Sequence, residues 1–301
     1  MDAVAIDQEL LPLQATGLSG QVHSVFDRAW NLSRGDDGTL LAVTTAQAGL
    51  GPRGITVGGA SLPAVPVGAP WALTAGRLVV DEHLIDLRGA LPTGLAVPSS
   101  ALLPELLEPW CDLVEAAWLL APADPFTEAV AELLETRMTT LTQLAAEAQV
   151  DVKSQVDAHA QLDTRAQVDT DAVTEAVRGL VGLGVGLTPS GDDVLSGILV
   201  ATCLPGAALA PLRLTIAAAV QDALALTVPI SASFLTDAIR GRAHSRVLDL
   251  LHALAGHGDL HAAHAAVLEI GHRSGLDLSA GLALGLAGRP SPARPPLKGI
   301  R

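Results

Sequence analysis

One stretch of the chain places carboxylates and hydroxyls directly after a run of glycines. It extends from Gly182 to Asp193 and reads GLGVGLTPSGDD. Its glycines, including Gly184 and Gly186, permit positive φ angles and let the backbone approach a ligand or a neighbouring helix. The adjacent carboxylates Asp192 and Asp193 could accept hydrogen bonds from a substrate amide, position an attacking amine, or hold Mg²⁺ against a phosphate oxygen. This stretch is therefore the first candidate for a catalytic or binding site.

The end of the same stretch predicts a loop that leads into a helix. Thr188 begins a turn, and Ser190 lies three residues before Asp193, which is the spacing of a capping box. A helix N-terminus presents free N–H groups and the positive end of the helix dipole, both of which favour anions. The backbone N–H groups of Ser190 and Gly191 are candidates for stabilising an oxyanion, which is typically worth about 3 kcal/mol per donor.

Two carboxylates in the first turn would repel a bare phosphate, so a cation, an arginine or a ligand amide must intervene. The stretch also lacks the G-x-x-x-x-G-K-[ST] spacing of a nucleotide-triphosphate loop. The alternative interpretation is that Asp192 and Asp193 only cap a buried helix.

A later segment repeats the pattern. Residues Ser274 to Asp277 read SGLD, and Gly281 follows Asp277 at the distance at which Gly197 follows Asp193. Each glycine lies two turns along the predicted helix, where a missing side chain permits close helix contact. We infer two related helices whose N-termini converge on one polar pocket, with Asp193 and Asp277 facing each other. Two independent capping boxes in a helical protein are the alternative.

Other polar residues are weaker candidates. His272 stands beside the second helix start, and Arg242 is placed to meet an anion, although it could equally be an exposed charge at a helix C-terminus. His261 and His264 share a helical face after the predicted cap Asp259, but no H-E-x-x-H pattern completes a ligand set, so no metal site is predicted there.

Composition narrows the classes of function. The chain has 301 residues, of which 49% are hydrophobic and 2% aromatic, so its core must be aliphatic. A net charge of −14 argues against nucleic-acid binding. The uncharged run Val194–Leu212 is interrupted by Pro205 and Gly206, which argues against a membrane span. The acidic N-terminus and two isolated cysteines predict a cytoplasmic protein.

Two kinds of segment must position these residues. Residues 1–100 are rich in short apolar runs between turn signals, such as Val22–Phe26, Thr39–Thr45 and Arg77–Val80. They predict a mostly-β barrel or sandwich. Residues 101–301 follow a helical period and predict an all-α domain that carries the glycine-rich and Asp-Asp motif. The expected class is α+β, with the tail after Arg289 extended and loose.

Three segments together resemble a known family. They are GLTPSGDD at 186–193, HSVF at 23–26 and GHRSGLD at 271–277. The sequence resembles a family, long of unknown function, that includes one subunit of the oxamate carbamoyltransferase of anaerobic allantoin degradation, a route of purine catabolism. The resemblance implies carbamoyl transfer between carbamoyl phosphate and oxamate within a multisubunit complex of unrelated subunits. It adds His23 to the substrate-binding candidates Gly184, Gly186, Thr188, Ser190, Gly191, His272, Ser274 and Arg242.

The sequence departs from the family pattern at two positions. Val185 stands where proline is expected, and Leu276 stands where an aromatic residue is expected. Neither change removes a polar group, but Leu276 puts the substrate of the family in doubt.

Three classes of function remain open. The first is a carbamoyltransferase subunit in which Asp192, Asp193 and Asp277 are catalytic. The second is a stand-alone metal-dependent hydrolase or phosphate-handling enzyme, in which the same carboxylates hold Mg²⁺. The third is a noncatalytic scaffold or ligand-sensing subunit, whose loop only packs helices.

Overall fold

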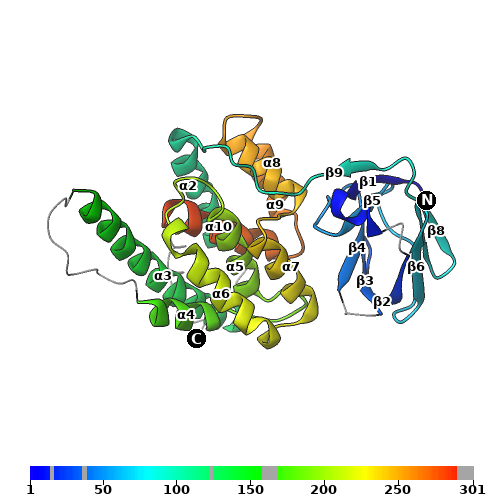
Figure 1. Ribbon diagram of the computed structural model, residues 1–301, viewed down its shortest axis with the longest axis horizontal. Coiled ribbons are helices and arrows are strands. Elements are labelled where there is room, and N and C mark those ends of the chain that lie inside the picture. The colour runs from blue at the N-terminus through cyan, green and yellow to red at the C-terminus, as the bar shows by residue number, and fades with distance from the viewer. Residues whose placement is uncertain (14–16, 36–38, 122–124, 158–168, 290–301) are drawn as a thin grey trace, which may run out of the picture. The chain divides into compact units, whose positions relative to one another are not determined.

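The computed structural model describes residues 1–13, 17–35, 39–121, 125–157 and 169–289. The predicted tail after Arg289 lies outside them, and so does Asp124, whose place before Pro125 predicts a helix cap. The chain forms two compact units. One contains Met1–Val97 together with Arg242–Leu250, and the other contains Pro98–Gly241 and Leu251–Arg301. Strands make up the first and helices the second (Figure 1), which confirms the α+β class.

The strands of the first unit form one curled, nine-stranded sheet in the order β8-β7-β6-β2-β3-β4-β5-β1-β9. They are β1 (Ala3–Asp7), β2 (Leu18–Phe26), β3 (Ala29–Arg34), β4 (Leu40–Thr45), β5 (Gly54–Val57), β6 (Pro70–Thr74), β7 (Arg77–Val80), β8 (His83–Asp86) and β9 (Leu91–Thr93). The three segments predicted as strands are confirmed in β2, β4 and β7.

The curl of the sheet encloses an aliphatic core with two tryptophans. In β6 and β7 buried and exposed residues alternate, so one face turns inward. Trp30 and Trp71 are buried in this core, and each indole N–H donates to a backbone carbonyl, at 3.1 Å to Pro63 and 3.0 Å to Ser33. A bridge between Asp2 and Asp86 ties the start of β1 to the far edge strand β8, so the sheet has the form of a half-barrel.

The remaining elements are helical. The α-helices are α2 (Pro104–Leu120), α3 (Pro125–Asp157), α4 (Thr170–Arg178), α5 (Ser190–Ala201), α6 (Arg213–Ala223), α7 (Pro229–Ile239), α8 (Ser245–Leu254), α9 (Leu260–Leu268) and α10 (Ser274–Ala287). The short 3₁₀ helices are η1 (Gln8–Leu10), η2 (Ala210–Leu212) and η3 (Leu224–Leu226). Among the described helices, none combines the length and the apolar character that crossing a membrane requires.

Helices α5 and α10 cross at their glycines, as the repeated pattern predicted. A Cβ added at Gly197 would lie 2.3 Å from the Leu278 carbonyl oxygen, and one at Gly281 would lie 2.0 Å from that of Val194. Any side chain at either position would therefore push the two backbones apart. This crossing fixes the start of α5 against the start of α10.

The capping boxes predicted at the two helix starts are wrong. Helix α5 has Pro189 as its N-cap and α10 has Arg273, and neither helix has a side-chain cap. The N–H groups of Asp192 and Asp193 both donate to the Pro189 carbonyl, so Ser190 is already the first helical residue. Ser274 occupies the same position in α10, and both serine hydroxyls are therefore released from capping.

Candidate functional site

The glycine-rich loop before α5 has the backbone conformation that its sequence predicted. Gly182, Gly184 and Gly186 have φ angles of 73°, 123° and 96°. A Cβ at Gly184 would lie 2.7 Å from the Ser190 amide nitrogen, whereas one at Gly186 would meet nothing within 4 Å. The loop is therefore folded tightly against the helix start at Gly184 and is open at Gly186.

Asp192 braces this loop. Its Oδ1 accepts a hydrogen bond of 2.8 Å from the Gly182 N–H, and its Oδ2 accepts one from the Thr227 hydroxyl. Burial raises the pKa of Asp192, and hydrogen bonds from Thr227, Gly182 and Ser231 oppose that rise. Both oxygens are occupied by the protein and the residue is 1% exposed, so its place is structural.

Asp193 has a different environment one residue later. Its carboxyl group hydrogen-bonds with the hydroxyls of Ser274 and Thr188, which lie 2.8 Å from each other. Its Oδ2 is buried and has no hydrogen-bond partner, although the residue is only 7% exposed. An unsatisfied buried carboxylate oxygen is costly, so this oxygen is a candidate for contact with a ligand.

The electrostatics of the site favour a proton on Asp193. Burial raises its pKa well above the ordinary value, and the nearby charges of Asp277 and Asp192 raise it further. Hydrogen bonds from Ser274 and Thr188 act in the opposite direction. Asp193 therefore keeps its proton to a higher pH than an exposed aspartate does.

Asp277, at the start of α10, is paired with a cation. Its Oδ1 accepts a hydrogen bond of 3.2 Å from Nε of Arg273, four residues earlier. The guanidinium carbon of Arg273 lies 5.3 Å from the ring centre of Trp118 in α2, within the range of a cation–π interaction. Asp277 is 1% exposed, so the carboxylate of this ion pair is buried.

The two helix starts converge, as predicted. The Thr188–Ser274 hydrogen bond joins the loop before α5 to the first residue of α10, and the charge of Asp277 is felt at Asp193. Thr188 and Ser274 are partly exposed, whereas Asp193 and Asp277 are buried. We name Thr188, Asp193, Ser274, Asp277 and Arg273 the helix-start cluster.

Gly191 does not serve the oxyanion role predicted for it. Its N–H donates to the Leu183 carbonyl at 2.8 Å, and a Cβ there would lie 2.0 Å from the Leu180 carbonyl oxygen. The residue is a glycine because the loop packs on it. Ser190, the other predicted oxyanion donor, is the partly exposed first residue of α5.

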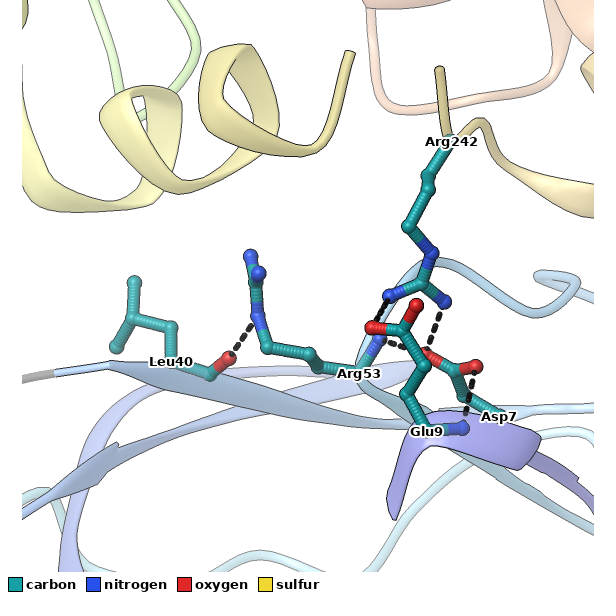
Figure 2. Close-up of polar contacts among 5 residues, drawn as sticks. All are labelled: Asp7, Glu9, Leu40, Arg53 and Arg242. Carbon is teal, nitrogen blue, oxygen red and sulfur yellow. Dashed lines mark hydrogen bonds and ion pairs between the residues drawn. The ribbon is translucent and has the colours of Figure 1, made fainter. Parts of the chain in front are cut away.

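Arg242 belongs to the β-rich unit and is engaged there, rather than in the unit that holds the helix-start cluster. Its guanidinium donates to Asp7 at 2.6 Å and to Glu9 (Figure 2). Asp7 also accepts from the Arg53 N–H at 2.6 Å, and both Asp7 and Arg242 are buried. The arginine therefore fastens residues 242–250 to the sheet, so the interpretation of Arg242 as an exposed charge is also wrong.

The histidines named as candidates in the sequence lie in separate parts of the structure. His23 lies in β2 of the β-rich unit, with its Nδ1 3.3 Å from the Ser24 hydroxyl. His272 is exposed, two residues before α10. His264 is buried against the edge of Trp110, and burial lowers its pKa. Within the described ranges, no group of three or more His, Cys, Asp or Glu side chains could hold a metal ion.

The sequence interpretation missed Arg273 and Trp118 at the site. Arg273 stands four residues before Asp277, the spacing of an ion pair on one helical face, and this signal was present in the sequence. Trp118 comes from a distant helix, and its place over Arg273 depends on a tertiary contact that no local pattern contains.

Two protein-family models match the chain, one in the helical region and one in the β-rich region. Residues 180–286 match the family model described as oxamate carbamoyltransferase subunit AllH, and this range contains the whole helix-start cluster. Residues 2–93 match the model of the AllH family N-terminal domain. No solved structure matches the chain.

Proposed function

Because the chain belongs to the AllH family, we propose that it is a subunit of a carbamoyltransferase complex that acts on carbamoyl phosphate and oxamate. The family name supports the role of a subunit, and the resemblance found in the sequence supports this pair of substrates. The isolated cysteines favour a reducing compartment, and we place the complex in the cytoplasm.

The reaction has a simple balance. The amide nitrogen of oxamate attacks the carbonyl carbon of carbamoyl phosphate, and a C–N bond forms. The C–O bond to the phosphoryl group breaks, and phosphate leaves with the electron pair. The nitrogen loses one proton, which phosphate finally carries, and the products are oxalurate and inorganic phosphate.

The unpartnered Oδ2 of Asp193 is the observation that carries this proposal. A primary amide offers two N–H donors, and one of them can satisfy this oxygen while the other reaches a hydroxyl of the cluster. The hydroxyls of Thr188 and Ser274 can each donate or accept, so they suit the carbonyl or carboxylate oxygens of the same small molecule.

In this proposal Asp193 is the catalytic residue, Thr188 and Ser274 bind the substrate, and Asp277 and Arg273 position the cluster. The raised pKa makes ionised Asp193 a stronger base than an ordinary aspartate. It can therefore take the proton that the amide nitrogen loses. The start of α5 adds the positive end of a helix dipole, which favours the developing negative charge.

The scaffold alternative explains the glycine crossing but not Asp193. Close packing of α5 on α10 requires Gly197 and Gly281, yet it does not require a buried carboxylate whose Oδ2 has no hydrogen-bond partner. Within the part of the chain that the structure describes, the metal-dependent alternative has no supporting observation, because Asp192 and Asp277 are held by Thr227 and Arg273 instead of being grouped as ligands.

A reconstituted complex tests the proposal. The chain is combined with the other transferase subunits, and oxalurate formation from carbamoyl phosphate and oxamate is measured. Asp193→Asn should lower the turnover by about 10²-fold or more, the usual effect of losing a general base. Ser279→Ala is the control, because this α10 hydroxyl is buried and donates to its own helix at Gly275. Unchanged turnover with Asp193→Asn would remove Asp193 from the chemistry.

A further inference from the structure

The charges of the helix-start cluster limit what it can bind. Asp193 and Asp277 are buried in it, and Asp192 lies next to it in the chain with its charge felt at Asp193. Arg273 is a cation of the cluster, but its Nε is already engaged by Asp277 and its guanidinium lies over Trp118. The acidic groups around Asp193 therefore outweigh the basic ones.

The free-energy cost of binding an anion beside these carboxylates depends on the charge of the anion. Coulomb energy scales with the product of the charges, so each carboxylate repels a phosphate dianion about twice as strongly as a monoanion. A proton on Asp193 reduces the repulsion but leaves the charge of Asp192. The helix dipole places roughly half a positive charge at the start of α5 and another at the start of α10. Together they offset the single charge of a carboxylate but not the double charge of a phosphate dianion.

The hydrogen-bonding groups point to the same class of ligand. Asp193 Oδ2 lacks a donor, and Thr188 and Ser274 stand beside it on the partly exposed side of the cluster. The phosphoryl dianion of carbamoyl phosphate offers acceptors only, so it cannot satisfy Oδ2 in the ionised form in which Asp193 acts as a base. A small primary amide that carries one carboxylate offers both donors and acceptors.

We infer that the helix-start cluster binds the monoanionic amide substrate, oxamate, and that another subunit of the transferase holds the phosphate of carbamoyl phosphate. This inference rests on the proposed function, and it divides the two substrates between chains. It also explains how a strongly acidic subunit can take part in a reaction that releases phosphate.

Calorimetry on the full chain without its partners tests this division. Sodium oxamate, oxalate, inorganic phosphate and carbamoyl phosphate are titrated separately, and phosphate is then added to the oxamate complex in tenfold excess. Oxamate should bind. Oxalate, which has the same size and no N–H group, should bind at least tenfold more weakly, and phosphate should not displace oxamate.

Two matched serine variants locate the binding. Ser274→Ala removes a hydroxyl of the cluster and should weaken oxamate binding about tenfold. Ser279→Ala makes the same change five residues further along α10, where the hydroxyl donates to the helix's own backbone at Gly275, and should leave the affinity unchanged. Circular dichroism of both variants shows whether the fold is retained.

The possible results separate this inference from the proposed function. Phosphate or carbamoyl phosphate that binds this chain in a Ser274-dependent way would overturn the division of substrates, and so would a failure of oxamate to bind. In either case, oxalurate formation by the reconstituted complex would still uphold the carbamoyltransferase assignment. A complex that forms no oxalurate would instead overturn the assignment itself.

Discussion

At the scale of single residues, Asp193 keeps a buried carboxyl oxygen without a hydrogen-bond partner, which opposes stability. The sequence alone does not distinguish the two adjacent aspartates, Asp192 and Asp193. Both carboxyl oxygens of Asp192 accept hydrogen bonds, whereas Oδ2 of Asp193 has no hydrogen-bond partner. The sequence predicted that both carboxylates lie at a helix start, and the structure places them in the first turn of α5. It could not predict which of them would be satisfied, because the partners Thr227 and Ser274 come from distant segments.

The raised pKa of Asp193 predicts a pH-dependent stability cost. The folded state binds the Asp193 proton more tightly than the unfolded state does, so this residue lowers the free energy of unfolding as pH rises above 3.8, the ordinary pKa of an aspartate. Asp193→Asn removes the cost, so the variant should have the higher Tm at pH 8. Its advantage should shrink as pH falls towards 3.8. Thermal unfolding of both proteins between pH 4 and 8 measures this, and an equal or lower Tm for the variant at pH 8 would contradict it.

The same titration predicts the pH profile of the reaction. If Asp193 accepts the proton of the amide nitrogen, turnover by the complex should rise with pH as Asp193 loses its own proton. The midpoint of this rise should lie well above the ordinary value for an aspartate. The residual activity of Asp193→Asn should lack this step, and a step that persists in the variant would assign it to another group.

At the scale of elements, the crossing of α5 and α10 holds the cluster together. Replacing a glycine in a helix interior by alanine usually stabilises a protein by about 1 kcal/mol. At Gly197 and Gly281 we expect the reverse, because the added methyl group would lie 2.3 Å and 2.0 Å from backbone oxygens. Each Gly→Ala change should cost about 1–3 kcal/mol or more, as overpacking does. Urea denaturation measures the loss.

Gly89→Ala is a control for this prediction, since a Cβ there meets nothing within 4 Å and no positive φ is needed. Its stability should change by less than about 0.5 kcal/mol. A stabilising Gly197→Ala would mean that the two helices do not cross closely.

The helix crossing was predictable and the caps were not, for one physical reason. Two glycines at matching positions indicate a close approach whatever the details of the helix start. A serine followed three residues later by an aspartate fits a capping box only if the serine precedes the first helical residue. In α5 the helix begins one residue earlier, with Pro189 as N-cap, and at the start of α10 the Ser274 hydroxyl bonds to Thr188 instead.

At the scale of the whole molecule, the β-rich unit depends on a segment that is remote in sequence. Arg242 follows α7, yet it forms a buried ion pair with Asp7 and a second ion pair with the exposed Glu9 (Figure 2). Arg242→Ala would leave Asp7 as an uncompensated buried charge, which typically costs 3–5 kcal/mol. We expect a loss of about this size in the unfolding free energy of the full chain.

Arg88→Ala is the matched control, because Arg88 forms an exposed ion pair with Asp86 in the same unit. We expect no comparable loss for this variant. Equal effects of the two substitutions would show that the Arg242 pair adds no more than a surface contact.

The sequence anticipated the α+β class and the convergence of the two helix starts, because hydrophobic periodicity and repeated glycines are local signals. It misplaced Arg242, because an ion pair between residues 7 and 242 leaves no local pattern. For the same reason, the stacking of Trp118 on Arg273 became visible only in the fold.

The central claim is that Thr188, Asp193 and Ser274 together hold the amide of the substrate. A crystal structure of the chain with oxamate tests it most directly. We expect oxamate beside the Thr188 and Ser274 hydroxyls, with its amide nitrogen within hydrogen-bonding distance of Asp193 Oδ2. Oxamate bound elsewhere, with this oxygen still unpartnered, would contradict it.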